Sequence, residues 1–228
     1  MIMVLFALAM SLASQPPTAS QPPLQSNLPP PRQSSPAHGD IHEDTDRGNS
    51  PEARSALHAY GACLVERNAP VAGGILQMDF TTRGYTDRLN RLMDANPNCF
   101  NRAGTRMRFQ KLGVAGAMAE RLIEREGRAL NTRLAQAARN QNAATYSPTD
   151  RIALCVVRSV PDQVAALFGS ELASPVEIEA ARALEPAFNA CNQGRTRLSV
   201  TTAGARAMLA TAAYRSLRAF EAAGGNRD

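Results

Sequence analysis

Apolar residues recur every three or four positions through most of residues 51 to 228, which is the spacing of amphipathic helices. The first helix is expected to begin at Ser50-Pro51, because a capping hydroxyl followed by proline is a common helix start. Leu57 and Leu64 then share one face. A proline shortly after Asn68 predicts that this helix ends near that residue.

The rest of the first half predicts a short helix in the apolar stretch around 71–78, two further helices and a short strand. One helix carries Leu89 and Leu92 and stops at Asn96-Pro97. Residues 105 to 109 alternate polar and apolar side chains, as a strand does. A long helix is expected from about 112 to 140, with Gly116 and Gly127 either weakening it or letting another helix approach closely.

The second half repeats this plan. Three helices are expected, each with a proline near its start, and then a short strand and a last helix that ends at Gly224-Gly225. The two short strands can pair with each other. The predicted ranges are a helix from 147 through 155, a short helix at 161–168, a helix at 174–191, a strand at 197–200 and a helix at about 202–223.

The cysteines indicate that one unit occurs twice. Cys63 and Cys99 lie 36 positions apart, as do Cys155 and Cys191, with an offset of 92 between the pairs. Apolar positions recur in the same frame, and the offset becomes 91 after a one-residue gap. The sequence therefore predicts a mainly α fold, a helical bundle of two tandem pseudo-symmetric units at about 51–142 and 147–224, with a small two-stranded β piece.

Several short motifs resemble uncharacterised exported proteins of alphaproteobacteria, particularly of sphingomonad-type bacteria. The motifs are Cys63-Leu64-Val65 with Cys155-Val156-Val157, Arg106-Met107-Arg108-Phe109 with residues 196–200, and Ala117-Met118-Ala119-Glu120 followed by Leu122. The resemblance covers roughly residues 55 to 220. The second unit departs from it at Thr211, where Glu120 would recur. The resemblance implies an exported helical protein and lends no established activity.

The N-terminal residues predict export. Residues 1 to 13 are an unbroken hydrophobic run, well short of the ~20 apolar residues of a membrane span. Small residues at Ser11 and Ala13 fit a signal peptide cleaved after Ala13, although its start carries no lysine or arginine. Residues 14 to 50, rich in Pro, Gln and Ser, are expected to be a disordered tether. We therefore expect a periplasmic or secreted protein whose mature chain has no transmembrane span.

Four cysteines in an exported chain favour disulfides. The simplest pairing joins cysteines within each unit, Cys63 to Cys99 and Cys155 to Cys191, although three pairings are possible. A zinc site is the competing interpretation. It is disfavoured because the sequence has no Cys-x-x-Cys pair and the body has one histidine, His58.

Composition adds a mildly basic body. The chain has a net charge of +5; the first 50 residues carry −2, which leaves +7 for residues 51 to 228. Lys111 is the only lysine, so the positive charge is almost all arginine. Nucleic-acid binding is not expected, since exposed aromatics are not interleaved with the basic residues and the compartment is wrong.

No set of residues in the sequence predicts catalysis, a cofactor or a metal. His58 is interpreted as a partly buried structural histidine, and Glu120 as part of a charged helix surface. The acidic stretch at 38–46 fails the spacing of a calcium-binding loop. One candidate for anion binding remains, a strip of arginines beside the two predicted strands: Arg102, Arg106, Arg108, Arg195 and Arg197.

The leading hypothesis from sequence is a non-enzymatic exported module that contacts an envelope protein or surface. The alternative is a protein that binds small anionic ligands through the arginine strip.

Overall fold

A computed structural model of the chain describes residues 40–42, 50–99, 110–140, 142–195 and 198–225. This part of the chain is mainly α-helical, as predicted. The helices are α1 (Pro51–Leu76), α2 (Arg83–Asp94), α3 (Lys111–Glu124), α4 (Leu130–Ala137), α5 (Pro148–Ser159), α6 (Pro161–Gly169), α7 (Pro175–Arg182), α8 (Glu185–Asn192) and α9 (Thr202–Ala222), with a 3₁₀ turn η2 (Pro97–Cys99) and two strands, β1 (Asp40–His42) and β2 (Ser199–Thr201).

Serine–proline pairs start three of these helices, as the sequence predicts. The hydroxyl of Ser50 accepts a hydrogen bond from a backbone N–H of the first turn of α1, and Ser147 and Ser174 do the same for α5 and α7. Each cap satisfies a donor that the helix leaves unpaired, and the proline that follows loses nothing because its position needs no N–H.

The first helix bends where the sequence predicts that it ends. Asn68 has non-helical angles (φ −143°, ψ 42°), and Pro70 follows it inside α1. The chain then resumes a helical path to Leu76, so the predicted end is a kink.

Two predicted long helices are broken. The helix expected from 112 to 140 is two helices, because α3 ends at Glu124 and Gly127 takes a positive φ of 65° before α4 begins. The helix expected from 174 to 191 ends at Arg182, and α8 begins at Glu185 with a proline in its first turn. That proline cannot continue the preceding helix without losing a hydrogen bond.

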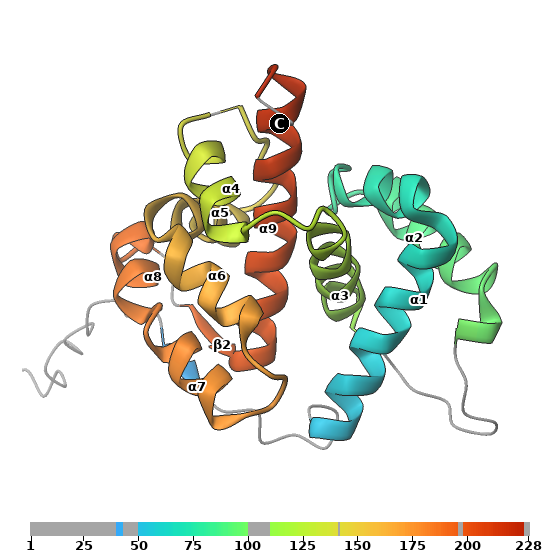
Figure 1. Cartoon of the computed structure of the whole chain (residues 1–228), viewed down its shortest axis with the longest axis horizontal. Coiled ribbons are helices and arrows are strands. Elements are labelled where there is room, and N and C mark those ends of the chain that lie inside the picture. Colours follow the sequence, from blue (N-terminus) through green and yellow to red (C-terminus); the bar gives the residue numbers. More distant parts are fainter. Residues whose placement is uncertain (1–39, 43–49, 100–109, 141, 196–197, 226–228) are drawn as a thin grey trace, which may run out of the picture. The chain divides into compact units, whose positions relative to one another are not determined.

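The core is built around α3 and α9, and α3 packs against both α1 and α9 (Figure 1). Gly116 on α3 allows close packing, one of the two alternatives that the sequence leaves open: a Cβ there would lie 2.6 Å from Cα and Cβ of Ala207 on α9. Gly61 on α1 has the same role, since its Cβ would lie 2.5 Å from Cβ of Ala117. The alanine-rich composition thus brings three helix axes close together.

The strand at 199–201 has a partner that the sequence did not predict. β2 pairs in parallel with β1, placing Ile41 opposite Val200, whereas residues 105–109 lie outside the described residues. Residues 40–42 belong to the segment expected to be disordered. Their position is explained by Ile41, whose apolar side chain is buried against the core.

Both disulfides form within the predicted pairs. Cys63 bonds to Cys99, with Cα atoms 5.6 Å apart, and Cys155 bonds to Cys191 at 5.8 Å. The zinc interpretation is therefore wrong. Two disulfides are compatible with an oxidising compartment.

Among the described helices, none is by itself long and apolar enough to cross a membrane, although α5 and α6, bent by 99°, meet the length and composition test as a pair.

Candidate functional site

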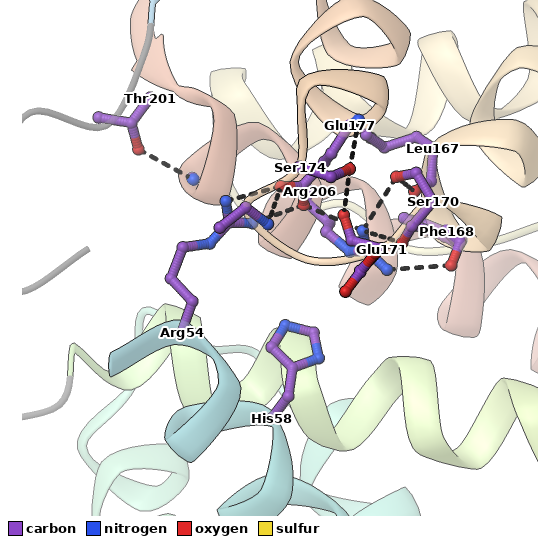
Figure 2. Close-up of polar contacts among 12 residues, drawn as sticks. Arg54, His58, Leu167, Phe168, Ser170, Glu171, Ser174, Glu177, Thr201 and Arg206 are labelled. Carbon is purple, nitrogen blue, oxygen red and sulfur yellow. Dashed lines mark hydrogen bonds and ion pairs between the residues drawn. The ribbon is translucent and has the colours of Figure 1, made fainter. Parts of the chain in front are cut away.

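A buried network of four charged side chains connects four helices. Arg54 on α1 donates to Glu177 on α7 through both terminal nitrogens, at 2.6 and 2.5 Å. Arg206 on α9 donates to the same Glu177 at 2.9 Å and to Glu120 on α3 at 2.7 and 3.0 Å. Figure 2 shows Arg54 and Arg206 converging on Glu177 from opposite sides. Two positive and two negative groups therefore balance one another inside the protein.

All three guanidinium nitrogens of Arg206 donate hydrogen bonds. Beyond the two carboxylates it donates to the backbone oxygens of Phe168 and Ser170, at 3.0 and 3.2 Å. Those oxygens lie at the end of α6, where a helix leaves carbonyl groups unpaired. Glu177 gains a further donor, the backbone N–H of Ala173 at 2.8 Å.

The two carboxylates differ in electrostatic environment. Burial raises the pKa of Glu120, and the hydrogen bonds from Arg206 oppose that shift without overcoming it. For Glu177, burial also acts to raise the pKa, but the hydrogen bonds from Arg54 and the charges of both arginines hold it below its usual value. Glu177 is thus the firmly ionised member, and Glu120 is the one that protonates first.

A polar cavity of about 370 Å³ borders this network on the side of His58. Nε2 of His58 lies 4.0 Å from Oε1 of Glu120, beyond hydrogen-bonding distance. Burial, together with the positive charges of Arg206 and Arg54, lowers the pKa of His58 to about 4, so the ring is neutral at ordinary pH. The cavity is lined by His58, Ala59, Ala62, Ala117, Glu120, Arg121, Glu124, Phe168, Ser170, Glu171, Leu172 and Arg206.

A second, apolar cavity of about 440 Å³ lies between α3, α5, α9 and the segment after α1. Most of its wall is hydrocarbon, with a few polar groups. It is lined by Leu76, Met78, Phe80, Tyr85, Lys111, Leu112, Ala115, Thr149, Asp150, Ala153, Leu198, Ser199, Val200, Met208, Thr211 and Arg215.

One buried ion pair lies in the apolar cavity. Arg215 donates to Asp150, and the other oxygen of Asp150 accepts from the backbone N–H of Tyr146 at 2.9 Å. The guanidinium also lies over the rings of Phe80 and Tyr146, 5.9 and 5.7 Å from their centroids. Burial raises the pKa of Asp150, against the opposing charge of Arg215. Nε of Arg215 has no hydrogen-bond partner among the described residues.

The predicted arginine strip is not assembled by the described residues. Arg102, Arg106, Arg108 and Arg197 lie outside them, and Arg195 is an exposed residue after α8. The interpretation of Glu120 as helix surface is wrong, because its side chain is 3% exposed. Its partner Arg206, missed by sequence reasoning, lies 86 positions away on a helix face otherwise rich in alanine, so no local signal marked the pair.

No group of three or more His, Cys, Asp or Glu within the described ranges is placed to hold a metal ion. Comparison with known protein families, with curated proteins and with solved structures finds no match.

Proposed function

We propose that this protein is an exported binding protein whose apolar cavity holds a small amphipathic molecule with a negatively charged head group. The observation that supports this proposal is the cavity of about 440 Å³ with hydrocarbon walls and one rim lysine. Ligand pockets of small-molecule binders commonly span ~300–1,000 Å³ and combine apolar walls with a few convergent polar groups.

The interior of the apolar cavity suits a hydrocarbon tail. Its buried charges, Asp150 and Arg215, neutralise each other. The hydroxyl of Thr211 donates to the backbone oxygen of Met208 at 2.9 Å, so this polar group is also satisfied. A ligand tail entering here displaces water from apolar walls without leaving these groups unpaired.

The rim of the cavity favours an anion. Lys111 lines it, and its ammonium donates to the hydroxyl of Thr86 at 3.3 Å on an exposed part of the surface. Because the Asp150–Arg215 pair has no net charge, the lining as a whole is positive by the one charge of Lys111.

Export to the periplasm or cell exterior is part of the proposal. The signal-like residues 1 to 13 and the two disulfides support it. Contact with an envelope protein or surface stays a prediction.

An internal duplication is also part of the proposal, and element boundaries support it. Helix α2 begins after the capping residue Thr82, and α7 begins after Ser174, which is 92 positions later. Helices α3 and α9 begin 91 positions apart, at Lys111 and Thr202. Each disulfide spans 36 positions.

The binding proposal is tested with three probes that share one tail: decanoate, decanol and decylammonium. Leu112 lies on the rim and is 40% exposed, so Leu112→Trp places a single tryptophan at the cavity in a chain that has none. We expect saturable fluorescence changes, strongest for decanoate. Lys111→Met should weaken decanoate binding roughly two- to fivefold, since a partly exposed ion pair is worth ~0.5–1 kcal/mol, and leave decanol binding unchanged.

Two matched controls make the test specific. Arg88→Met on the exposed face of α2 removes the same charge away from the cavity and should leave all three affinities unchanged. Ala115→Leu fills the cavity and should abolish binding, whereas Ala135→Leu, on the exposed face of α4, should not. Binding that survives Ala115→Leu, or no binding of any of the three probes, would refute the proposal.

A further inference from the structure

The two cavities occupy corresponding positions of the proposed duplicated unit. At the offset of 92, His58 of the polar cavity corresponds to Asp150 of the apolar cavity. At the same offset, Leu76, Met78 and Phe80 of the apolar cavity correspond to Phe168, Ser170 and Leu172 of the polar cavity. After the one-residue gap the offset is 91, and the matches are Ala115 with Arg206, Ala117 with Met208, Glu120 with Thr211, and Glu124 with Arg215. The polar cavity is lined by α1 and α3 of the first unit, and by the segment after α6 and one residue of α9 from the second. The apolar cavity is lined by α5 and α9 of the second unit, and by the segment after α1 and the start of α3 from the first.

These matches show where the cavities differ. In the apolar cavity, Ala115 stands at the position equivalent to Arg206, and Thr211 stands at the position equivalent to Glu120. These smaller side chains leave open the space that the Arg206–Glu120 ion pair fills beside the polar cavity. The same framework thus has one hydrocarbon-lined cavity and one cavity lined by hydrogen-bonding groups.

We infer that the polar cavity is a second ligand site, which binds a neutral, hydroxylated compound such as a polyol or a sugar. The geometry of His58 points to such a ligand independently of the duplication. Its ring forms no hydrogen bond with the described residues, and Nε2 stands 4.0 Å from Oε1 of Glu120. A hydroxyl between these two atoms can donate to the carboxylate and hydrogen-bond to the imidazole.

The charged groups around the polar cavity disfavour a charged ligand. The positive groups Arg206 and Arg54 act on His58 and disfavour a cation there, consistent with its low pKa. Three carboxylates, Glu120, Glu124 and Glu171, line the same cavity against two arginines, Arg121 and Arg206, so the lining is negative by one charge and disfavours an anion. Figure 2 shows the His58 ring pointing from α1 toward Arg206. A neutral ligand that offers both donors and acceptors satisfies these groups.

His58 is also the natural reporter for a binding experiment. The chain has three histidines, and His38→Gln with His42→Gln leaves His58 as the only imidazole signal in an NMR spectrum. The probes are glucose, glycerol and inositol as neutral compounds, with butylammonium and butyrate as charged ones. We expect at least one neutral probe to shift the His58 ring signal saturably in the millimolar range and neither charged probe to do so.

A pair of substitutions on α1 locates the effect. Ala59 is exposed and lines the polar cavity, so Ala59→Met should fill it and abolish the shift without loss of the fold. Ser55→Met, on the same helix and outside the cavity, should leave the shift intact. The inference is overturned if no neutral probe shifts His58, if a charged probe shifts it instead, or if the shift persists in Ala59→Met.

Discussion

Replacement of Arg206 by methionine tests whether the buried network stabilises the packing between the two halves of the chain. The guanidinium bonds to Glu120 on α3 and to Glu177 on α7, and its side chain is 4% exposed. Methionine keeps much of the aliphatic volume but removes every donor. Glu177 would then keep Arg54 as its partner, and Glu120 would lose the arginine that compensates its charge.

The expected cost follows from the geometry. Removing one partner of a buried ion pair costs about 3–5 kcal/mol, because the remaining charge is left without compensation. The backbone oxygens of Phe168 and Ser170 also lose their donor. Glu120, whose pKa is already raised, can take up a proton and limit the loss. We expect a loss of about 4 kcal/mol in the free energy of unfolding, which for a chain of this size corresponds to roughly 10 °C in Tm.

The assay is urea unfolding followed by circular dichroism with both disulfides intact. Arg182→Met, which removes an exposed partner of Glu179, is the control and should change stability by less than about 0.5 kcal/mol. The double variant Arg206→Met/Glu120→Gln should recover part of the loss, since it removes one of the stranded charges. If Arg206→Met costs no more than Arg182→Met, the reasoning is wrong.

Three further predictions concern the disulfides, pH and helix packing. Replacing Cys155 and Cys191 by serine should lower stability by about 3.8 kcal/mol, the loop-closure entropy of a 36-position separation, measured against the oxidised chain by urea unfolding. The pKa of His58 is lowered to about 4, so the unfolded chain binds the extra proton first. Stability should therefore fall as pH drops from about 6.5 toward 4, and His58→Gln should flatten that slope in thermal melts. Gly116→Ala should destabilise the protein by about 1–3 kcal/mol because its Cβ meets the α9 backbone. Gly74→Ala, with nothing within 4 Å, should stabilise it by about 0.5–1 kcal/mol, and a reversal of this order in calorimetry would contradict the packing argument.

The sequence predicts features that depend on local chemistry. The serine–proline starts of α1, α5 and α7 are readable because cap and proline are adjacent. The close approach at Gly116 is one of the two roles that the sequence allows for this glycine, since a missing side chain on a helix suggests a close neighbour. The disulfide pairing follows from a repeated spacing.

Features that depend on distant partners could not be predicted. Glu120 resembles a surface residue because charged neighbours surround it in sequence, and only Arg206 on α9 explains its burial. The breaks after Glu124 and Arg182 were missed, because the helical spacing of apolar residues continues across both. A cavity cannot be read from periodicity, since it depends on which small side chains face one another.

The disulfides have a consequence for how the chain is made. Cys63 pairs with Cys99 and Cys155 with Cys191, so each cysteine bonds to its nearest neighbour along the chain and the two loops do not interleave. A chain emerging N-terminus first into an oxidising space would meet its correct partners in order of appearance. Each pair could close before the next cysteine arrived, and oxidation in order of synthesis would give the native connectivity without reshuffling by an isomerase.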